Sequence, residues 1–206
     1  HSNLGMALRA LGQEAGAEQS FREAIALNPL HTKALSNLAG LLRITGEISG
    51  ALYYARKAVE VTKSDSEAYN NLGNAERDAG LIEEGIASYR TAIELDPNFA
   101  LAHWNLSLSL LRAGHFEEGF REMRWRWQWL KFPGRRPAFD KPEWSGDDLN
   151  GRTLLLYPEQ GLGDMLFMLR FVSIIKSSGC QFVLELPDEL IPLAEHSEIA
   201  DSILRL

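Results

Sequence analysis

Hydrophobic and small residues recur along the first 130 residues with a period of 34. Four Asn-Leu pairs mark the period, with the asparagines at positions 3, 37, 71 and 105. Glycine recurs at positions 12, 46, 80 and 114, and a small residue recurs at positions 17, 51, 85 and 119. Small residues let two helices cross closely, and glycine suits the left-handed turn that ends a helix. The pattern predicts eight helices in antiparallel pairs, the first of them truncated.

This pattern resembles the tetratricopeptide repeat, a 34-residue unit of two helices that stacks into an α-solenoid. A second small position holds Ala24, Ala58 and Ala92, but the fourth copy has Arg126 there. We expect the last helix of the fourth copy to continue through the tryptophans at positions 125, 127 and 129. The resemblance implies a solenoid of about four repeats, the first truncated, over residues 1–130.

Residues 131–150 are rich in proline and aromatic residues and are predicted to form a linker. Beyond them, apolar runs at 153–157 and 182–186 are typical of buried parallel strands. Helices are expected over about 165–176 and 187–194, and a third strand over 202–206. The alternation predicts the start of an α/β domain over residues 151–206, too short to be complete. The expected fold class is mainly α: a tetratricopeptide repeat solenoid followed by a partial α/β (Rossmann-like) segment.

The composition narrows the classes of partner. The net charge is −7, so bulk attraction to nucleic acid or to an anionic membrane is not expected. Cys180 is the only cysteine, which excludes an intrachain disulfide and fits a reducing compartment such as the cytoplasm. No apolar run approaches the roughly 20 residues that span a bilayer. The histidines lack the spacing of metal ligands, so no metal site is predicted.

An aromatic and basic stretch at residues 121–136 has two interpretations. Basic residues that alternate with tryptophans can bind single-stranded nucleic acid. However, Trp125 and Trp129 would share one face of a helix, which favours packing between the solenoid and the α/β segment. We expect these two side chains and Trp144 to be largely buried.

The repeated asparagines are the main candidate for a binding site. An asparagine amide offers two donors and an acceptor, so a row of amides can hold the backbone of a peptide without reading its side chains. We expect the row to face a concave groove that binds an extended protein or peptide; it consists of Asn3, Asn37, Asn71 and Asn105. Arginines with the same period add positive charge, which favours acidic segments; they are Arg9, Arg43 and Arg77. Asparagines that only support local helix contacts, and solvated arginines, remain the alternative.

A glycine-rich turn follows the first predicted strand. Leu166 stands where a dinucleotide-binding fingerprint has its third glycine, so that motif is absent. Gly161 and Gly163 are expected to let the strand turn sharply into a helix. Asp164 is either the cap of that helix or a general base at the carboxyl end of the strand.

A second resemblance extends over residues 120–206. The segments Trp125-Arg126-Trp127, Pro142-Glu143-Trp144 and 151–164 resemble bacterial repeat proteins fused to a heptosyltransferase-like glycosyltransferase (family 9, GT-B fold). The resemblance implies that Asp164 is a catalytic base and that the full-length protein uses a nucleotide-sugar donor. In such enzymes the donor site lies in a C-terminal domain, so we expect no cofactor and no activity in this fragment. The asparagine row also resembles that of the O-linked N-acetylglucosamine transferase, which holds the acceptor polypeptide.

These observations predict a protein-binding repeat module in the N-terminal part of a glycosyltransferase-like protein. A non-catalytic interaction scaffold is the alternative, and an enzyme for lipid or glycan acceptors with repeats used for oligomerisation is a third. The short α/β segment would leave a sheet edge and apolar surface open, with Leu155, Leu184 and Leu186 as candidates. Because open edges recruit other chains, and the solenoid has an open N-terminal end, self-association is expected.

Overall fold

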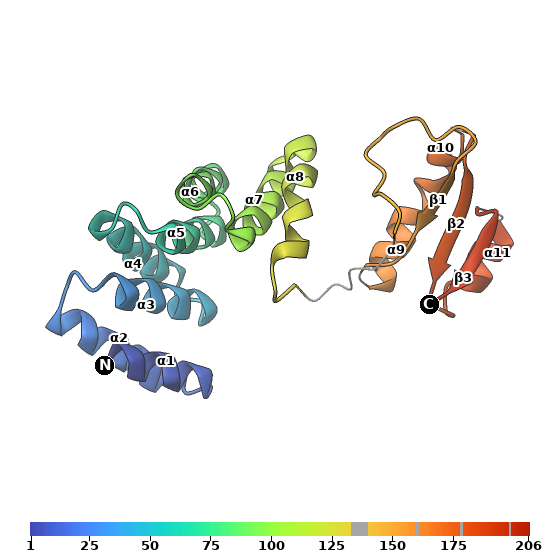
Figure 1. Ribbon diagram of the computed structural model, residues 1–206. Coiled ribbons are helices and arrows are strands. Elements are labelled where there is room, and N and C mark those ends of the chain that lie inside the picture. The colour runs from blue at the N-terminus through green and yellow to red at the C-terminus, as the bar shows by residue number, and fades with distance from the viewer. Residues whose placement is uncertain (133–139, 160, 178, 198) are drawn as a thin grey trace. The chain divides into compact units, whose positions relative to one another are not determined.

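The computed structural model describes residues 1–132, 140–159, 161–177, 179–197 and 199–206. The chain divides into two compact units, residues 1–132 and residues 133–206. The first unit is helical, and the second contains a three-stranded sheet with helices (Figure 1).

Helix pairs form the first unit, as the 34-residue pattern predicts. The first four helices are α1 (Ser2–Ala10), α2 (Glu14–Leu27), α3 (Thr32–Ile44) and α4 (Ile48–Val61). The next four are α5 (Ser66–Asp78), α6 (Ile82–Leu95), α7 (Ala100–Ala113) and α8 (Phe116–Met123), and a 3-10 helix η1 (Arg124–Gln128) follows. Each odd-numbered helix pairs with the even-numbered helix after it, and successive pairs stack along the unit (Figure 1).

The turn glycines have the conformation that the sequence predicts. Their φ angles are 72° at Gly12, 87° at Gly46, 82° at Gly80 and 87° at Gly114. In each turn the next residue donates its backbone N–H to a carbonyl five residues earlier, as Glu47 does to Leu42. This arrangement satisfies a carbonyl that the helix end leaves open, and residues with a Cβ adopt the glycine's conformation only at a cost.

Small residues let an aromatic ring of the even helix pack against the odd helix. A Cβ added to Gly73 would lie 2.6 Å from Cε1 of Tyr89, and a Cβ added to Gly5 would lie 2.6 Å from Cε1 of Phe21. Both rings are fully buried. Two of the small positions named from the sequence also make close contacts: a Cβ added to Gly85 would lie 3.0 Å from the carbonyl oxygen of Gly73, and one added to Gly119 would lie 2.8 Å from Cδ2 of Leu111.

The fourth repeat departs from the prediction. Its second α-helix, α8, ends at Met123. Trp125 and Trp127 lie in the 3-10 helix η1 that follows. Arg126, which replaces the small residue of the other repeats, donates from Nη1 to the carbonyl of Met123. A guanidinium is too large for a close helix crossing, so the chain turns away at this point.

The second unit is a parallel sheet with helices between its strands. It comprises β1 (Thr153–Leu156), α9 (Leu162–Leu169), α10 (Val172–Lys176), β2 (Gln181–Leu186), α11 (Ile191–Ser197) and β3 (Ser202–Arg205). The strand order is β1-β2-β3, with Leu154 opposite Phe182 and Leu184 opposite Ile203. The single helix expected over 165–176 is broken in two near Phe171.

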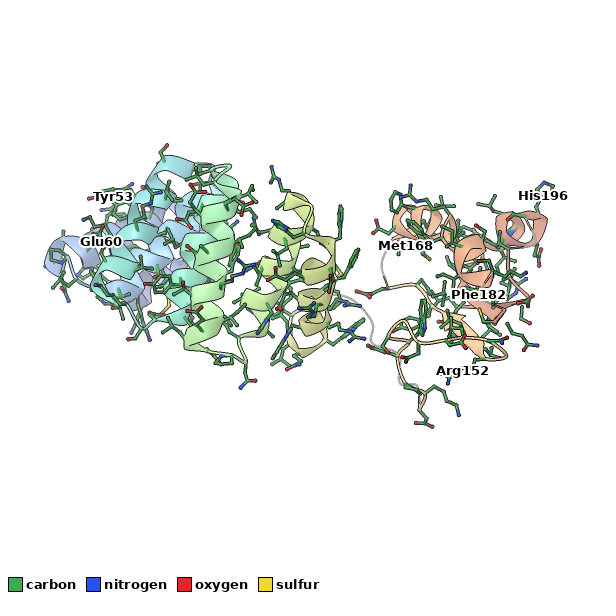
Figure 2. The ribbon with its side chains drawn as sticks, turned by 90° about the horizontal axis from the view of Figure 1, so that it is seen from above. Tyr53, Glu60, Arg152, Met168, Phe182 and His196 are labelled. Atoms are coloured by element: carbon green, nitrogen blue, oxygen red, sulfur yellow. The ribbon has the colours of Figure 1, made fainter. Side chains whose placement is uncertain are left out.

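One face of this sheet carries the core of the unit. Phe182, Leu184 and Leu186 alternate along β2 and pack with Val172 of α10 and Ala194 of α11. Phe182 is fully buried in the middle of the unit, whereas Met168 and His196 lie at its surface (Figure 2). Because alternate residues of a strand point to one face, α10 and α11 cover the same face.

Two residues expected in an exposed layer are in fact core residues. Leu184 is 1% exposed and Leu186 is 3% exposed, so that expectation was wrong for both. The opposite face presents Leu155, Val183 and Glu185, all half-buried. A small parallel sheet is therefore present, but with helices packed on one face the Rossmann-like assignment is not confirmed.

Two further features concern only the residues that the structure describes. None of their helices is long and apolar enough to cross a membrane. No group of three or more histidine, cysteine and acidic side chains among them is arranged to hold a metal ion.

Candidate peptide-binding wall

The odd-numbered helices α1, α3, α5 and α7 lie beside one another and form what we call the odd-helix wall. Successive members contact each other directly. Arg43 Nη1 of α3 lies 2.9 Å from Asp78 Oδ2 of α5, and Asn105 Nδ2 of α7 lies 2.9 Å from Asn70 Oδ1 of α5. Neighbouring odd helices are therefore joined by side-chain contacts between residues 35 positions apart.

The repeated asparagines differ in exposure along this row. Asn3 is exposed, Asn37 and Asn71 are half-buried, and Asn105 is only 8% exposed. The side chains of Asn3, Asn37 and Asn71 make no hydrogen bond to any described residue, so their amides are available to a ligand. The amide of Asn105 is partly occupied, because it donates to Asn70.

The residue before each asparagine explains this difference. It is Ser2, Ser36, Asn70 and Trp104 in the four repeats. Asn70 is 3% exposed and carries an amide long enough to accept from Asn105. Ser36, which stands in the same relation to Asn71, has a short side chain, and its buried Oγ has no partner among the described residues.

Two of the three predicted arginines are already paired. Arg43 and Arg77 both contact Asp78, with Arg77 Nε 3.2 Å from Asp78 Oδ1. One carboxylate thus offsets part of the positive charge that the sequence suggested. Arg9 is exposed, and its Nη1 atom would lie 3.7 Å from a Cβ added to Gly40 of α3.

Side chains from the core also fix parts of the wall. The hydroxyl of Tyr89 donates to Oδ1 of Asn74, at 3.0 Å, from the buried side of α5. Burial raises the pKa of Tyr89 well above its ordinary value, so the hydroxyl remains a donor. Asn74 is therefore held by the core, one turn along α5 from Asn70.

In the described part of the aromatic and basic stretch, residues 121–132, the tryptophans make different contacts. Trp125 stacks on the buried His103 of α7, with ring centroids 3.9 Å apart and planes 4° apart. Trp127 and Trp104 both contact Phe132 edge to face. Trp144, which we expected to be buried, is 41% exposed, and its Nε1 donates to the carbonyl of Asp147.

The predicted glycine-rich turn is simpler than expected. Gly161 is the N-cap of α9 with a φ of −66°, and Gly163 lies in the first turn of the helix. A Cβ on either would have no heavy atom within 4 Å, so glycine is not sterically required at these positions. Asp164 is exposed in the first turn and makes no side-chain cap hydrogen bond, so the interpretation as a capping residue is wrong.

Comparison with known proteins identifies the helical unit. The family described as tetratricopeptide repeat matches residues 2–68, and the family described as TPR repeat matches residues 73–114. The helical unit is a tetratricopeptide repeat solenoid. Such solenoids are protein-binding modules. No curated protein matches the chain significantly.

Solved structures agree with this assignment. The chain is similar to MamA (residues 41 to the end) from Desulfovibrio magneticus RS-1, with 25% identity and a TM-score of 0.55 over 60% of this chain and 70% of that one. TTC0263, a thermophilic protein of Thermus thermophilus, has 24% identity and a TM-score of 0.55 over the same shares. The first tetratricopeptide domain of Spaghetti (RPAP3), bound to the HSP90 peptide SRMEEVD, has 20% identity and a TM-score of 0.53 over 55% of this chain and 90% of that one.

The tetratricopeptide register also shows which residues the sequence analysis missed. Asn70 and Asp78 both lie on the wall, and both change the availability of a predicted site residue. Asn70 stands where the first two repeats have serine, and Asp78 directly follows the third of the repeated arginines. The signal in the sequence is that each of these two residues departs from the repeat, whereas the asparagines and arginines keep it.

Proposed function

We propose that the odd-helix wall binds the main chain of an extended polypeptide through Asn3, Asn37 and Asn71. The observation that carries the proposal is that these three amides are exposed or half-buried and make no hydrogen bond to any described residue. An amide pairs with both the N–H and the C=O of a peptide bond, which every sequence offers. Asn105 would contribute less, because its amide already donates to Asn70.

The spacing of the helices fits an extended ligand. Packed helices lie about 8–10 Å apart, and an extended chain rises about 3.3 Å per residue. Each repeat would therefore take about three residues, and the three available amides would span about six or seven. The tetratricopeptide domain of RPAP3, which holds a seven-residue peptide, supports this length for the fold.

The charges of the wall favour recognition of the main chain over recognition of acidic side chains. Asp78 pairs with two of the three arginines, so a ligand carboxylate would have to compete with it. Arg9 has no acidic partner among the described residues and offers one cationic contact near the N-terminal end. We infer a ligand with little sequence preference and at most one favoured acidic residue.

A selection experiment tests this function. Random dodecapeptides displayed on phage would be selected on the wild-type chain, and a selected peptide would be labelled for fluorescence anisotropy. Each amide pair contributes about 0.5–1.5 kcal/mol, so replacing Asn3, Asn37 and Asn71 by Ala should weaken binding by about 10- to 1000-fold. Glu83→Ala with Glu94→Ala on the even helix α6 is the control, and it should bind like wild type. Equal affinity for the triple variant would exclude the wall as the site.

A second candidate function rests on the second unit. Asp164 is exposed in the first turn of α9, in the segment that follows the carboxyl end of β1. Active sites of α/β proteins form at this edge of a parallel sheet. Together with the resemblance to heptosyltransferase-like enzymes, this favours a cytoplasmic sugar transferase of GT-B type with Rossmann-like domains. Asp164 would be its base, a nucleotide sugar its donor, and the wall would hold the acceptor.

The test of this second function requires the protein with its donor domain. Asp164→Asn removes the proton acceptor and, because no side-chain cap is lost, should leave the melting temperature unchanged. Loss of a positioned base costs about 10²–10⁴-fold in rate. Transfer at the wild-type rate would remove Asp164 from the mechanism and favour the non-catalytic scaffold.

A further inference from the structure

Asp78, the last residue of α5, is held between arginines of two successive repeats. Arg43 of α3 donates from Nη1 to Oδ2 of Asp78 at 2.9 Å, and Arg77 of α5 donates from Nε to Oδ1 at 3.2 Å. The two arginines are 34 residues apart, so they occupy the same position in neighbouring repeats. Each oxygen of the carboxylate thus has its own arginine, and the contact between the second and third repeats contains a complete site for one carboxylate.

The contact between the first and second repeats has the same donors but lacks the acid. The equivalent arginines are Arg9 and Arg43, whereas Ile44 stands where the third repeat has Asp78. Arg9 is exposed and makes no hydrogen bond or ion pair to any described residue. Arg43 binds Asp78 through Nη1, and its Nε has no partner among the described residues. Arg9 Nη1 and Arg43 Nε therefore correspond to the two atoms that hold Asp78, and both are available.

The place that a carboxylate would occupy between α1 and α3 is open. The guanidinium of Arg9 extends across to α3, where its Nη1 would lie 3.7 Å from a Cβ added to Gly40. Gly40 comes one turn before Ile44, and the third repeat has the larger Asn74 at the equivalent position. Ile44 itself is 55% exposed. The place lies on the side of α1 that faces α3, so it belongs to a contact inside the helical unit.

This place shares a face of α3 with the amide of Asn37. Ile44 follows Asn37 by seven residues, so the two side chains lie on one face, about 10 Å apart along the helix. Asp78 stands in the same relation to Asn71. A main chain held at the asparagines therefore passes beside the place, within reach of a long side chain.

We propose that the side-chain carboxylate of a glutamate in the bound polypeptide occupies this place, with one oxygen on Arg9 Nη1 and the other on Arg43 Nε. Hydrogen bonds between a guanidinium and a carboxylate are stronger than those between neutral groups, and their geometry is specific. Glutamate is favoured over aspartate because the carboxylate has to extend sideways from the asparagines. The inference rests on the proposed binding of a main chain to the wall, and it gives that binding one point of sequence preference.

A glutamate scan of the selected peptide tests this subsite. Each residue would be replaced in turn by glutamate and by glutamine, in peptides with an amidated C-terminus. At one position only, glutamate should bind about fivefold tighter than glutamine, and salt should reduce the difference. Arg9→Gln should remove the preference, whereas Lys63→Gln, which removes an exposed cation in the turn after α4, should keep it. Tighter binding of the free acid without a glutamate preference would place a C-terminal carboxylate there instead.

Exchanges on the protein test the equivalence with Asp78. Ile44→Asp should fill the place and abolish the glutamate preference, and Ile44→Asn is the uncharged control. In an NMR titration the carboxyl introduced by Ile44→Asp should have a pKa below the ordinary value, and adding Arg9→Gln should restore that value. This measurement needs no peptide. Asp78→Asn should release Arg43 Nη1 and Arg77 Nε and create a second preferred position, about three peptide residues from the first. Far-UV circular dichroism would verify that all variants remain folded.

Three results would overturn the proposal: no position that prefers glutamate, a preference that survives Arg9→Gln, or a preference that survives Ile44→Asp. The proposed function is judged separately, by the triple variant of Asn3, Asn37 and Asn71. Weak binding by that variant with no glutamate preference in the wild type would keep the main-chain site and remove the subsite. Wild-type binding by that variant, with a glutamate preference that Arg9→Gln abolishes, would do the reverse. A chain that selects no peptide at all would overturn both.

Discussion

Asn105 donates its amide to Asn70 across the odd-helix wall, whereas the equivalent pair one repeat earlier, Asn71 and Ser36, makes no hydrogen bond. The two pairs have the same separation of 35 residues along the chain. The length of one side chain therefore determines whether a repeated amide is used inside the solenoid or is available to a ligand.

Placing serine at position 70 and asparagine at position 36 should free the amide of Asn105 and engage the amide of Asn71 in a hydrogen bond. Asn70→Ser removes the acceptor of a buried donor, which should lower the free energy of unfolding by about 1–3 kcal/mol. Ser36→Asn offers Asn71 an acceptor and should raise the free energy of unfolding by about 0.5–1.5 kcal/mol, while weakening binding of the selected peptide. Urea unfolding followed by circular dichroism measures the first quantity, and fluorescence anisotropy measures the second.

Ser36→Ala is the matched control for this exchange. It removes a buried hydroxyl that has no partner among the described residues, so stability should stay equal or rise slightly. Peptide binding should not change, since the amide of Asn71 stays available. Wild-type stability of Asn70→Ser would mean that the hydrogen bond to Asn105 contributes nothing to the fold.

Two glycines of the wall should respond in opposite directions to alanine. In Gly73→Ala the new Cβ would lie 2.6 Å from Cε1 of Tyr89, a buried ring whose hydroxyl is bound to Asn74. Overpacking of this kind costs about 1–3 kcal/mol. In Gly40→Ala the nearest atom is the flexible end of Arg9 at 3.7 Å, so the helix should gain up to about 1 kcal/mol. Thermal unfolding of both variants tests this contrast, and equal shifts would contradict it.

Glu76 should make the stability of the solenoid depend on pH. Three repeats have leucine at this position, whereas Glu76 is 6% exposed and accepts a hydrogen bond of 2.6 Å from Ser88. Burial raises the pKa of Glu76, and the hydrogen bond from Ser88 offsets only part of this rise. The folded state therefore binds a proton at Glu76 more tightly than the unfolded chain does. Its contribution to stability is fully present below the unfolded pKa of about 4.3 and is lost as pH rises through the folded pKa.

Glu76→Gln tests this dependence because it keeps an acceptor for Ser88 and removes the charge. The variant should be more stable than wild type at pH 7, and the difference should disappear near pH 4. Urea unfolding at both pH values gives the comparison, with the exposed Glu83→Gln as the control. An advantage of Glu76→Gln that is equal at both pH values would show that the charge of Glu76 is not the cause.

The sequence was sufficient for the parts of the fold that depend on local rules. A glycine that must adopt positive φ, as Gly46 does, can be found from its period alone. Helix pairing follows from the same period, because the small residue of each even helix has to lie against the helix before it, as Gly85 does against Gly73. The strands of the second unit were predicted to within about two residues from their apolar runs.

The remaining features depend on which side chains meet in space. The end of α8 at Met123 could not be read from the tryptophans after it, because their helical spacing is compatible with a longer helix. The pairing of two arginines with Asp78 depends on how far α5 is shifted along α3. The burial of Leu184 depends on which face of the sheet the helices cover.

His103 should hold the end of the solenoid together through three contacts. Its Nε2 lies 3.1 Å from the carbonyl oxygen of Pro97, which can only accept, so this nitrogen carries a proton. Its Nδ1 contacts Glu122 of α8, and its ring stacks on Trp125 of η1. The short α8 is thus fixed to α7 by one side chain.

His103→Phe tests this role because it keeps an aromatic ring for Trp125 and removes both hydrogen bonds. The side chain of Glu122 is 19% exposed, so its loss of a partner should lower stability by about 1–3 kcal/mol. Adding Glu122→Leu removes the unpaired carboxylate and should restore part of the loss. Thermal unfolding of both single variants and the double variant should give a coupling energy of about 0.5–3 kcal/mol. Additive effects would mean that the stack on Trp125 alone fixes this end, and that the contact with Glu122 is incidental.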